Sequence, residues 1–227
     1  MFIVQCFLYL CTHIIINKVK MKQFLIAVLL AMPMIASAQD NTWERAEKTP
    51  TEKANPDAKY LVENAVPVVD GKVCWETTIQ APGKSAQQIY DILLAQMEMM
   101  VKEPNQIEGK SNIVVNEPGT YQLGAVFCEW LVFKSTALVL DETQLNFNLM
   151  VECSDGQAKV TMTRIIYLYE LERNPERYVA EEWITDKYSV NKKHTKLLPN
   201  SGKFRRKTID RKDFIFNKFA TLLNNVE

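Results

Sequence analysis

The chain contains few of the residues on which recognisable catalytic and cofactor sites depend. Its 227 residues include only 7 glycines and 2 histidines, and no G-x-G-x-x-G or Walker-type run occurs, which excludes the common glycine-rich phosphate loops. No Cys-x-x-Cys, His-Glu-x-x-His or EF-hand pattern is present, so the sequence provides no cluster of metal ligands. A catalytic triad would depend on His194, and no nucleophile-elbow sequence lies near it. We therefore expect no cofactor, no metal and no enzymatic activity, and a hydrolase is the weakest alternative.

The N-terminal region predicts export. Met21, Lys22 and Gln23 precede an apolar run over residues 24–35, and the small triplet Ala-Ser-Ala follows at residues 36–38. This order is typical of a bacterial secretory signal peptide. We expect residues 21–38 to be that peptide, with cleavage after Ala38. No cysteine stands at the cleavage site, so a lipoprotein-type anchor is not indicated.

Residues 1–20 precede this signal peptide and are themselves largely apolar. Neither apolar run reaches the roughly 20 residues that a spanning helix requires. We interpret residues 1–20 as an upstream extension from a start codon assigned too early. The alternative is a membrane hairpin over residues 1–35. We expect no membrane span in the mature chain.

Without residues 1–38, the chain contains 24 basic and 27 acidic residues, which gives a net charge of about −3. A mildly acidic exported protein has no bulk electrostatic reason to bind nucleic acid, so we expect no such partner. The remaining cysteines are Cys74, Cys128 and Cys153. An odd number at wide spacing is no disulfide framework. Two interpretations stay open, one bridged pair or three unpaired strand cysteines, and we favour the second.

The periodicity along the mature chain predicts three parts. Residues 39–64 are polar and contain two prolines, which indicates an N-terminal arm. Residues 65–171 alternate between strand and helix patterns and predict an α+β domain. Residues 172–227 predict a basic linker and a C-terminal helical extension, with a short helix over 181–190 and a final helix capped by Asp210.

Within the central domain, Asp70 and Gly71 predict a hairpin turn before a strand over residues 73–79. Ser85, with Gln88 three residues later, predicts a capped helix that ends before Pro104. Further strands are expected over residues 112–115, 122–133, 136–140, 145–151 and 158–171. The short turns between them favour an antiparallel meander with one apolar face, which the capped helix would cover.

A cluster of basic residues occupies the predicted linker. Seven lysines and arginines fall within 16 residues that contain no acid: Lys192, Lys193, Lys196, Lys203, Arg205, Arg206 and Lys207. One interpretation is a patch that binds an anionic polymer, phosphate or lipid head groups. The other, which we favour, is a solvated loop that balances acidic neighbours such as Glu170 and Glu172.

Several segments resemble domain-of-unknown-function family 4468, which is described as having a TBP-like fold. They are residues 66–73, the Pro-Gly-Lys-Ser opening of the helix at residues 82–85, residues 183–186, and Gly-Lys-Phe-Arg-Arg at residues 202–206. The resemblance implies an α+β fold with a curved antiparallel sheet of about five to six strands, packed against one long helix and a C-terminal helix. It also implies export by a Gram-negative bacterium, to the periplasm or cell envelope. It implies no activity, and the TBP-like label is taken as a statement of fold alone.

Two functional hypotheses remain. The first is a non-catalytic exported binding module with a protein or polymer partner. The second is a carrier of a small apolar molecule, held in a cavity between sheet and helix. The residues expected to line that cavity are Trp75, Met97, Met100, Trp130 and Phe147.

Overall fold

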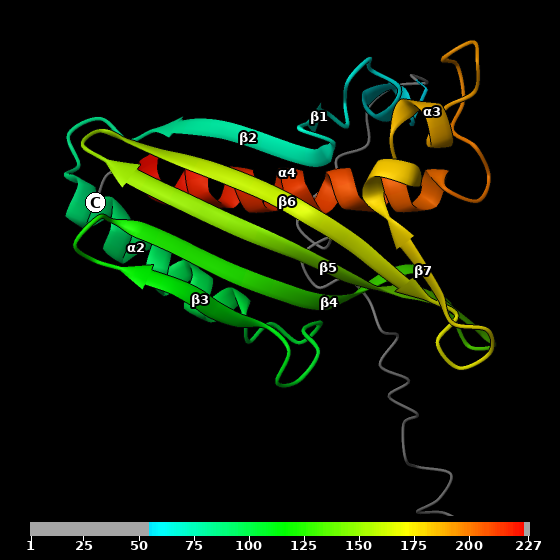
Figure 1. Cartoon of the computed structure of the whole chain (residues 1–227), viewed down its shortest axis with the longest axis horizontal. Helices are drawn as coiled ribbons and strands as arrows, with labels where there is room; N and C mark the ends of the chain where they lie inside the picture. Colours follow the sequence, from blue (N-terminus) through cyan, green and yellow to red (C-terminus); the bar gives the residue numbers. More distant parts are fainter. Residues whose placement is uncertain (1–54, 225–227) are drawn as a thin grey trace, which may run out of the picture. The chain divides into compact units, whose positions relative to one another are not determined.

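The computed structural model describes residues 55–224. The predicted upstream extension, the signal peptide and residues 39–54 of the predicted arm lie outside this range. The described residues form an α+β fold (Figure 1). Its strands are β1 (Val68–Val69), β2 (Lys72–Gln80), β3 (Asn112–Glu117), β4 (Gln122–Thr136), β5 (Val139–Ser154), β6 (Gln157–Tyr169) and β7 (Glu176–Val179). Its helices are α2 (Ala86–Met100), α3 (Asp186–Ser189) and α4 (Gly202–Asn224), with short 3-10 turns η2 (Ala58–Tyr60) and η3 (Ala180–Glu182).

These strands form one antiparallel sheet in the order β1-β2-β6-β5-β4-β3, and β7 pairs with the end of β6. The sheet of residues 55–224 therefore has seven strands, where five to six were expected. The strand that the sequence did not reveal is β7, which has only four residues, Glu-Arg-Tyr-Val. A strand this short carries too little alternation to be recognised by its period.

The predicted hairpin between β1 and β2 is confirmed. Asp70 and Gly71 have φ values of 49° and 72°, the left-handed pair that a two-residue type I′ turn requires. Val69 and Lys72 are partners on either side of the turn. Val73, Trp75 and Ile79 then alternate into the core along β2.

β4 and β5 form one long hairpin. The predicted separate strand over residues 136–140 is wrong, because Thr136 pairs with Val139 at the tip of this hairpin. Asp141 and Glu142, which follow the predicted strand over 136–140, lie inside β5. Asp141 accepts hydrogen bonds from Lys203 and Tyr169 on the face of the sheet that α4 covers. Glu142 lies on the opposite face of the sheet.

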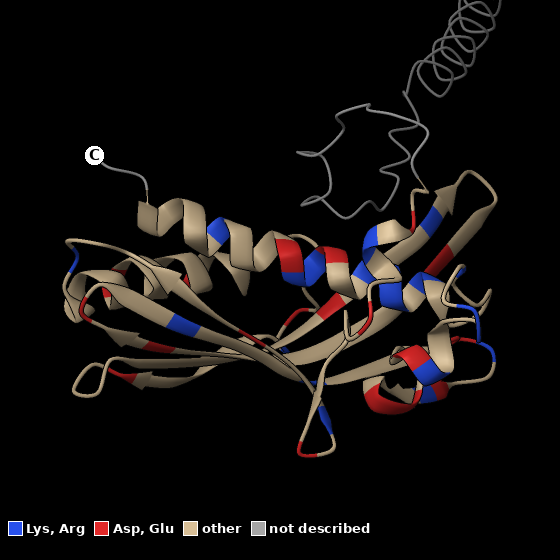
Figure 2. Ribbon diagram, turned by 90° about the horizontal axis from the view of Figure 1, so that it is seen from above, with Lys and Arg blue, Asp and Glu red and all other residues tan. Residues whose placement is uncertain are grey.

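Helices α2 and α4 lie on the same side of the sheet (Figures 1 and 2). Between them and the strands lies the core, in which Phe127 of β4 stacks on Phe147 of β5 with ring centroids 4.9 Å apart. No helix in the described range covers the opposite face of the central strands. We call this opposite face the uncovered face.

Helix α2 begins as predicted. The Ser85 side chain accepts a hydrogen bond from the Gln88 backbone N–H, and the Gln88 side chain accepts one from the Ser85 N–H. This capping box satisfies two backbone donors that the helix itself leaves without partners.

Replacing Ser85 with alanine is expected to lower the free energy of unfolding by about 1 kcal/mol, because one helix N–H loses its acceptor. Urea denaturation followed by circular dichroism measures the change. Gln87→Ala is the matched control, since Gln87 is an exposed residue of the same first turn outside the capping box. Equal losses for the two variants would contradict the capping role.

Helix α4 differs from the prediction. It begins at Gly202 and not near Asp210, so residues 202–207 of the predicted basic linker are helical. Its buried residues include two arginines, Arg205 and Arg211. The sequence prediction assigned cations to the solvent side of a helix. Because buried arginines do not fit such an amphipathic pattern, the first two turns of α4 were not recognised as helical.

The predicted single helix over residues 181–190 is also wrong. η3 and α3 replace it, with Trp183 between them as the cap of η3. Ile184 is fully buried, whereas Tyr188 is exposed.

The described part of the predicted polar arm packs against α4. Tyr60 is 6% exposed, and its hydroxyl donates to the carboxylate of Asp210. Arg206 pairs with Asp57 at 2.7 Å. Asp57 and Tyr60 of the predicted arm are therefore docked on α4.

Three further observations concern residues 55–224. No helix there is long and apolar enough to cross a membrane. No group of three or more metal-type ligands occurs in that range. The thiols of Cys74, Cys128 and Cys153 are free, and burial raises the pKa of each, that of Cys153 to about 11.

Candidate functional site

The five residues predicted to line a cavity between sheet and helix do not converge. Four of them are buried in the core: Trp75, Met97, Met100 and Phe147. Trp130 lies on the uncovered face, where it is the partner of Gln144 on β5. The predicted site is therefore divided between the two faces of the sheet.

The orientation of Trp130 follows from its neighbour. Glu129 points into the core and is 0% exposed, so alternation along β4 turns Trp130 outward. Carboxylates usually lie on the solvent side of a strand, and that rule would place Glu129 outside and Trp130 in the core. Glu129 faces inward because α4 provides a cation for it.

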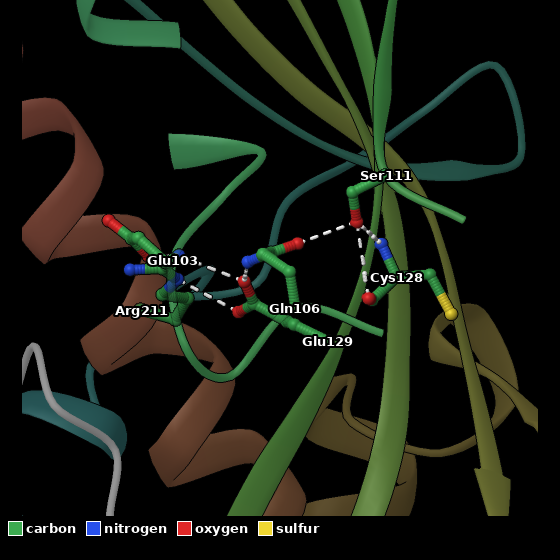
Figure 3. Close-up of polar contacts among 6 residues, drawn as sticks. All are labelled: Glu103, Gln106, Ser111, Cys128, Glu129 and Arg211. Atoms are coloured by element: carbon green, nitrogen blue, oxygen red, sulfur yellow. Dashed lines mark hydrogen bonds and ion pairs between the residues drawn. The ribbon is translucent and has the colours of Figure 1, made fainter. Parts of the chain in front are cut away.

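That cation is Arg211 (Figure 3). Its Nε and Nη2 donate to the two carboxylate oxygens of Glu129, each at 2.8 Å, and Nη2 also donates to Glu103 at 2.7 Å. Burial by itself lowers the pKa of Arg211, but the two carboxylates outweigh it and the pKa is raised overall. The guanidinium thus stays charged in the core.

The network continues to the loop between α2 and β3 (Figure 3). Gln106 donates to Glu129 at 2.6 Å, and Ser111 donates to Gln106 at 2.6 Å. The backbone of this loop pairs with β4: the Ile107 N–H donates to the Cys128 carbonyl, and the Trp130 N–H donates to the Asn105 carbonyl. The buried ion pair therefore holds β4 at the position from which the Trp130 side chain leaves the sheet.

The predicted basic patch is also divided. Lys203 donates to Asp141 and lies over the rings of Phe133 and Tyr169, each with its centroid 4.6 Å away. Arg205 is 0% exposed and donates to the carbonyls of Tyr60 and Ile184. These cations stabilise the fold, and Figure 2 shows acidic and basic residues next to one another along α4.

The other members of the predicted patch lie elsewhere. Arg206 pairs with Asp57, and Lys207 is a half-buried residue of α4 with a partner of its own. Lys192, Lys193 and Lys196 are exposed in the loop before α4. The structure thus does not assemble the seven cations into a single patch.

A groove of about 450 Å³ lies at one end of the sheet, and Trp130, Glu142 and Leu168 line it from the uncovered face. It lies where the β4–β5 hairpin and the β6–β7 connection meet. The groove residues are Trp130, Val139, Leu140, Asp141, Glu142, Leu168, Tyr169, Glu170, Leu171, Glu172 and Arg173. Its volume is within the range of small-molecule and peptide-side-chain pockets.

Two kinds of side chain meet in this groove. Trp130 and Leu168 flank Gln144 across three neighbouring strands, and Leu140 is half exposed. Four carboxylates and one guanidinium complete the lining. The groove is therefore both apolar and acidic. No helix of residues 55–224 covers the side that Trp130 lines, whereas Asp141 and Tyr169 on the other side contact Lys203 of α4.

Glu142 is a groove carboxylate with a raised pKa. Burial, followed by the nearby Glu172 carboxylate, raises its pKa above the usual value. Its Oε2 atom is buried and has no hydrogen-bond partner among residues 55–224. Glu142 thus carries a desolvation cost that no contact within the described domain offsets.

Replacing Glu142 with glutamine is expected to raise the urea midpoint of unfolding at pH 7. Because its folded pKa is raised, the native state binds more protons than the unfolded state, and stability falls as pH rises through that pKa. The difference between variant and wild type should close as pH falls towards the unfolded value of about 4.3. Glu152→Gln, an exposed residue on the same face of β5, is the control and should show no such gap. A variant less stable than wild type at pH 7 would contradict the assignment.

The sheet order and the two helices on one face define an α+β domain of TBP-like fold. A family model described as "Domain of unknown function (DUF4468) with TBP-like fold" matches residues 75–168. A solved DUF4468 family protein from Bacteroides ovatus ATCC 8483 is similar at 40% identity, with a TM-score of 0.69, over 76% of this chain and 98% of that one. The chain therefore belongs to the DUF4468 family, for which no catalytic activity is described.

A second solved structure supports the fold alone. It is a TBP-like protein from Parabacteroides distasonis ATCC 8503, at 19% identity and a TM-score of 0.59, over 72% of this chain and 99% of that one. No curated protein matches the chain.

Proposed function

We propose that the protein is a non-catalytic, exported binding module of the periplasm or cell envelope, and that it binds a protein partner through the groove. The observation that carries the proposal is a groove that combines exposed apolar and acidic side chains and is lined by Trp130 from the uncovered face. A concave site with apolar walls and a few polar groups is the usual form of a binding site.

The construction around the groove favours a rigid binding surface. Trp130 projects from a strand whose backbone is held by the Asn105 carbonyl and by the Arg211–Glu129 ion pair behind it. A large aromatic side chain held in this way can contribute much of the binding energy of an interface. Little conformational entropy is then lost on binding.

Site-specific photo-crosslinking in cells tests this proposal. Benzoylphenylalanine at Leu140, which is 50% exposed in the groove, should form a covalent adduct with a partner. The same residue at Met99 of α2, which is 59% exposed, should form none. Adding Trp130→Ala to the Leu140 variant should remove the adduct. Equal adducts at both positions, or none at either, would contradict the proposal.

A further inference from the structure

Two hydrogen-bond acceptors on β5 are left without donors beside the groove. They are Oε2 of Glu142 and Oε1 of Gln144, both buried and without a partner in the described part of the chain. Gln144 is only 7% exposed. Buried polar atoms are almost always paired in native proteins, so such a pair of acceptors requires an explanation.

The two acceptors belong to one surface. Residues 142 and 144 are two positions apart on a strand, so their side chains lie on the same face, ~7 Å from each other. The partner of Gln144 on β4 is Trp130, and its partner on β6 is Leu168. A group that reached these acceptors would lie beside an aromatic ring and an apolar side chain.

The chemistry of this surface selects a cation. A carboxylate and an amide oxygen accept hydrogen bonds, so the missing group is a donor. Of the four carboxylates of the groove, Asp141 is paired with Lys203 and Glu170 lies near Arg173, which leaves Glu142 and Glu172 without a cation among the lining residues. Arg173 is 85% exposed and lies 3.9 Å from Glu170, so it does not reach the two buried acceptors. Guanidinium and ammonium groups provide several donors and also stack on aromatic rings.

The backbone beside the groove favours an extended polypeptide. β6 pairs with β5 only as far as Tyr169, opposite Thr143. Residues 139–142 of β5 continue past that point and pair with β4 alone. Their other edge has no strand partner among residues 55–224, and an open edge of this kind can pair with an added strand.

We propose that the groove binds an arginine or lysine side chain from an extended segment of a partner protein, and that this segment pairs with the open edge of β5 at residues 139–142. The cation donates to Glu142 and Gln144, and its alkyl stem packs on Trp130. The inference deepens the proposed function and rests on it. It adds the chemistry of the partner and the manner of its binding.

Synthetic octapeptides test this inference. The probe alternates arginine and valine, and matched peptides replace arginine with citrulline, replace arginine with glutamate, or methylate alternate backbone amides. Isothermal titration calorimetry on the folded protein should show binding of the arginine peptide. Affinity should fall at least tenfold with citrulline, because the charge-assisted hydrogen bonds are lost. It should also fall with N-methylation, while the glutamate peptide should not bind.

Protein variants provide the matched control. Glu142→Gln should weaken binding of the arginine peptide about tenfold, whereas Glu152→Gln, on the same face of β5, should leave it unchanged. Equal affinity for arginine and citrulline, or for methylated and unmethylated backbones, would overturn this inference. Agmatine carries a guanidinium group but no polypeptide backbone. If it bound as tightly as the peptide, the proposed pairing of an extended segment with β5 would be wrong. If a crosslink at Leu140 forms but no arginine peptide binds, only this inference fails; if neither occurs, the proposed function fails as well.

Discussion

Replacing Arg211 with methionine is expected to lower the free energy of unfolding by about 3–5 kcal/mol, the cost of breaking a buried ion pair from one side. Arg211 and Glu129 are each 0% exposed, so the variant leaves the Glu129 carboxylate buried without its cation. Glu103 loses its hydrogen-bond donor Arg211 at the same time. Urea denaturation at pH 7 measures the loss.

The double variant Arg211→Met, Glu129→Leu separates the two causes. It removes the buried charge together with its partner, so it should recover at least half of the stability that the single variant loses. A single variant that costs less than about 1 kcal/mol would show that solvent reaches the pair. A double variant no more stable than the single one would show that lost packing, and not the unpaired carboxylate, is responsible.

Replacing Trp130 with alanine is expected to weaken partner binding about 30-fold or more, which corresponds to about 2 kcal/mol for a central aromatic residue of an interface. The fold should be affected little, because Trp130 is only half-buried and makes no core contact. The affinity of the arginine peptide or of the crosslinked partner measures the effect, alongside urea denaturation of the same variant.

Trp75→Ala is the matched control. Trp75 is buried between sheet and helices, and its indole N–H donates to the Ala65 carbonyl at 2.8 Å. Truncation there should cost about 3–5 kcal/mol of stability. Molecules of this variant that remain folded should bind with unchanged affinity. The opposite result, in which Trp75→Ala lowers affinity and Trp130→Ala lowers stability, would support the alternative of a binding cavity between sheet and helix.

Much of the fold could be predicted because local signals and burial agree there. In three places the structure agrees with the local sequence pattern. These are the Asp70-Gly71 turn, the capping box at Ser85 and the alternation of Leu145, Phe147 and Leu149. Each is decided by neighbours within a few residues. The helix-covered antiparallel sheet follows from them.

Three of the errors share one cause, which is charge buried inside the protein. Glu129, Arg205 and Arg211 are buried because each finds partners far away in the sequence. No local pattern reveals such pairs. Because of these buried charges, the sequence analysis placed Trp130 on the wrong face of the sheet. It also began the last helix two turns too late and assigned the basic residues of those turns to a linker.

The candidate site was harder to predict than the fold. Of its members, the sequence singled out Trp130, but for the wrong face of the sheet. Glu142 and Gln144 gave no signal, because their significance depends on which donors are missing around them. Two like charges, Glu142 and Glu172, are 30 residues apart in the chain and come together only through the β5–β6 pairing and the loop that follows it.

The central claim is that the uncovered face of the sheet binds a partner. The most direct measurement is a titration of ¹⁵N-indole-labelled protein with the arginine and valine octapeptide, followed by NMR. The account predicts that the Trp130 indole resonance shifts in a saturable manner while that of Trp75 stays in place. A shift of Trp75 with Trp130 unchanged would contradict the account and place binding between the sheet and its helices.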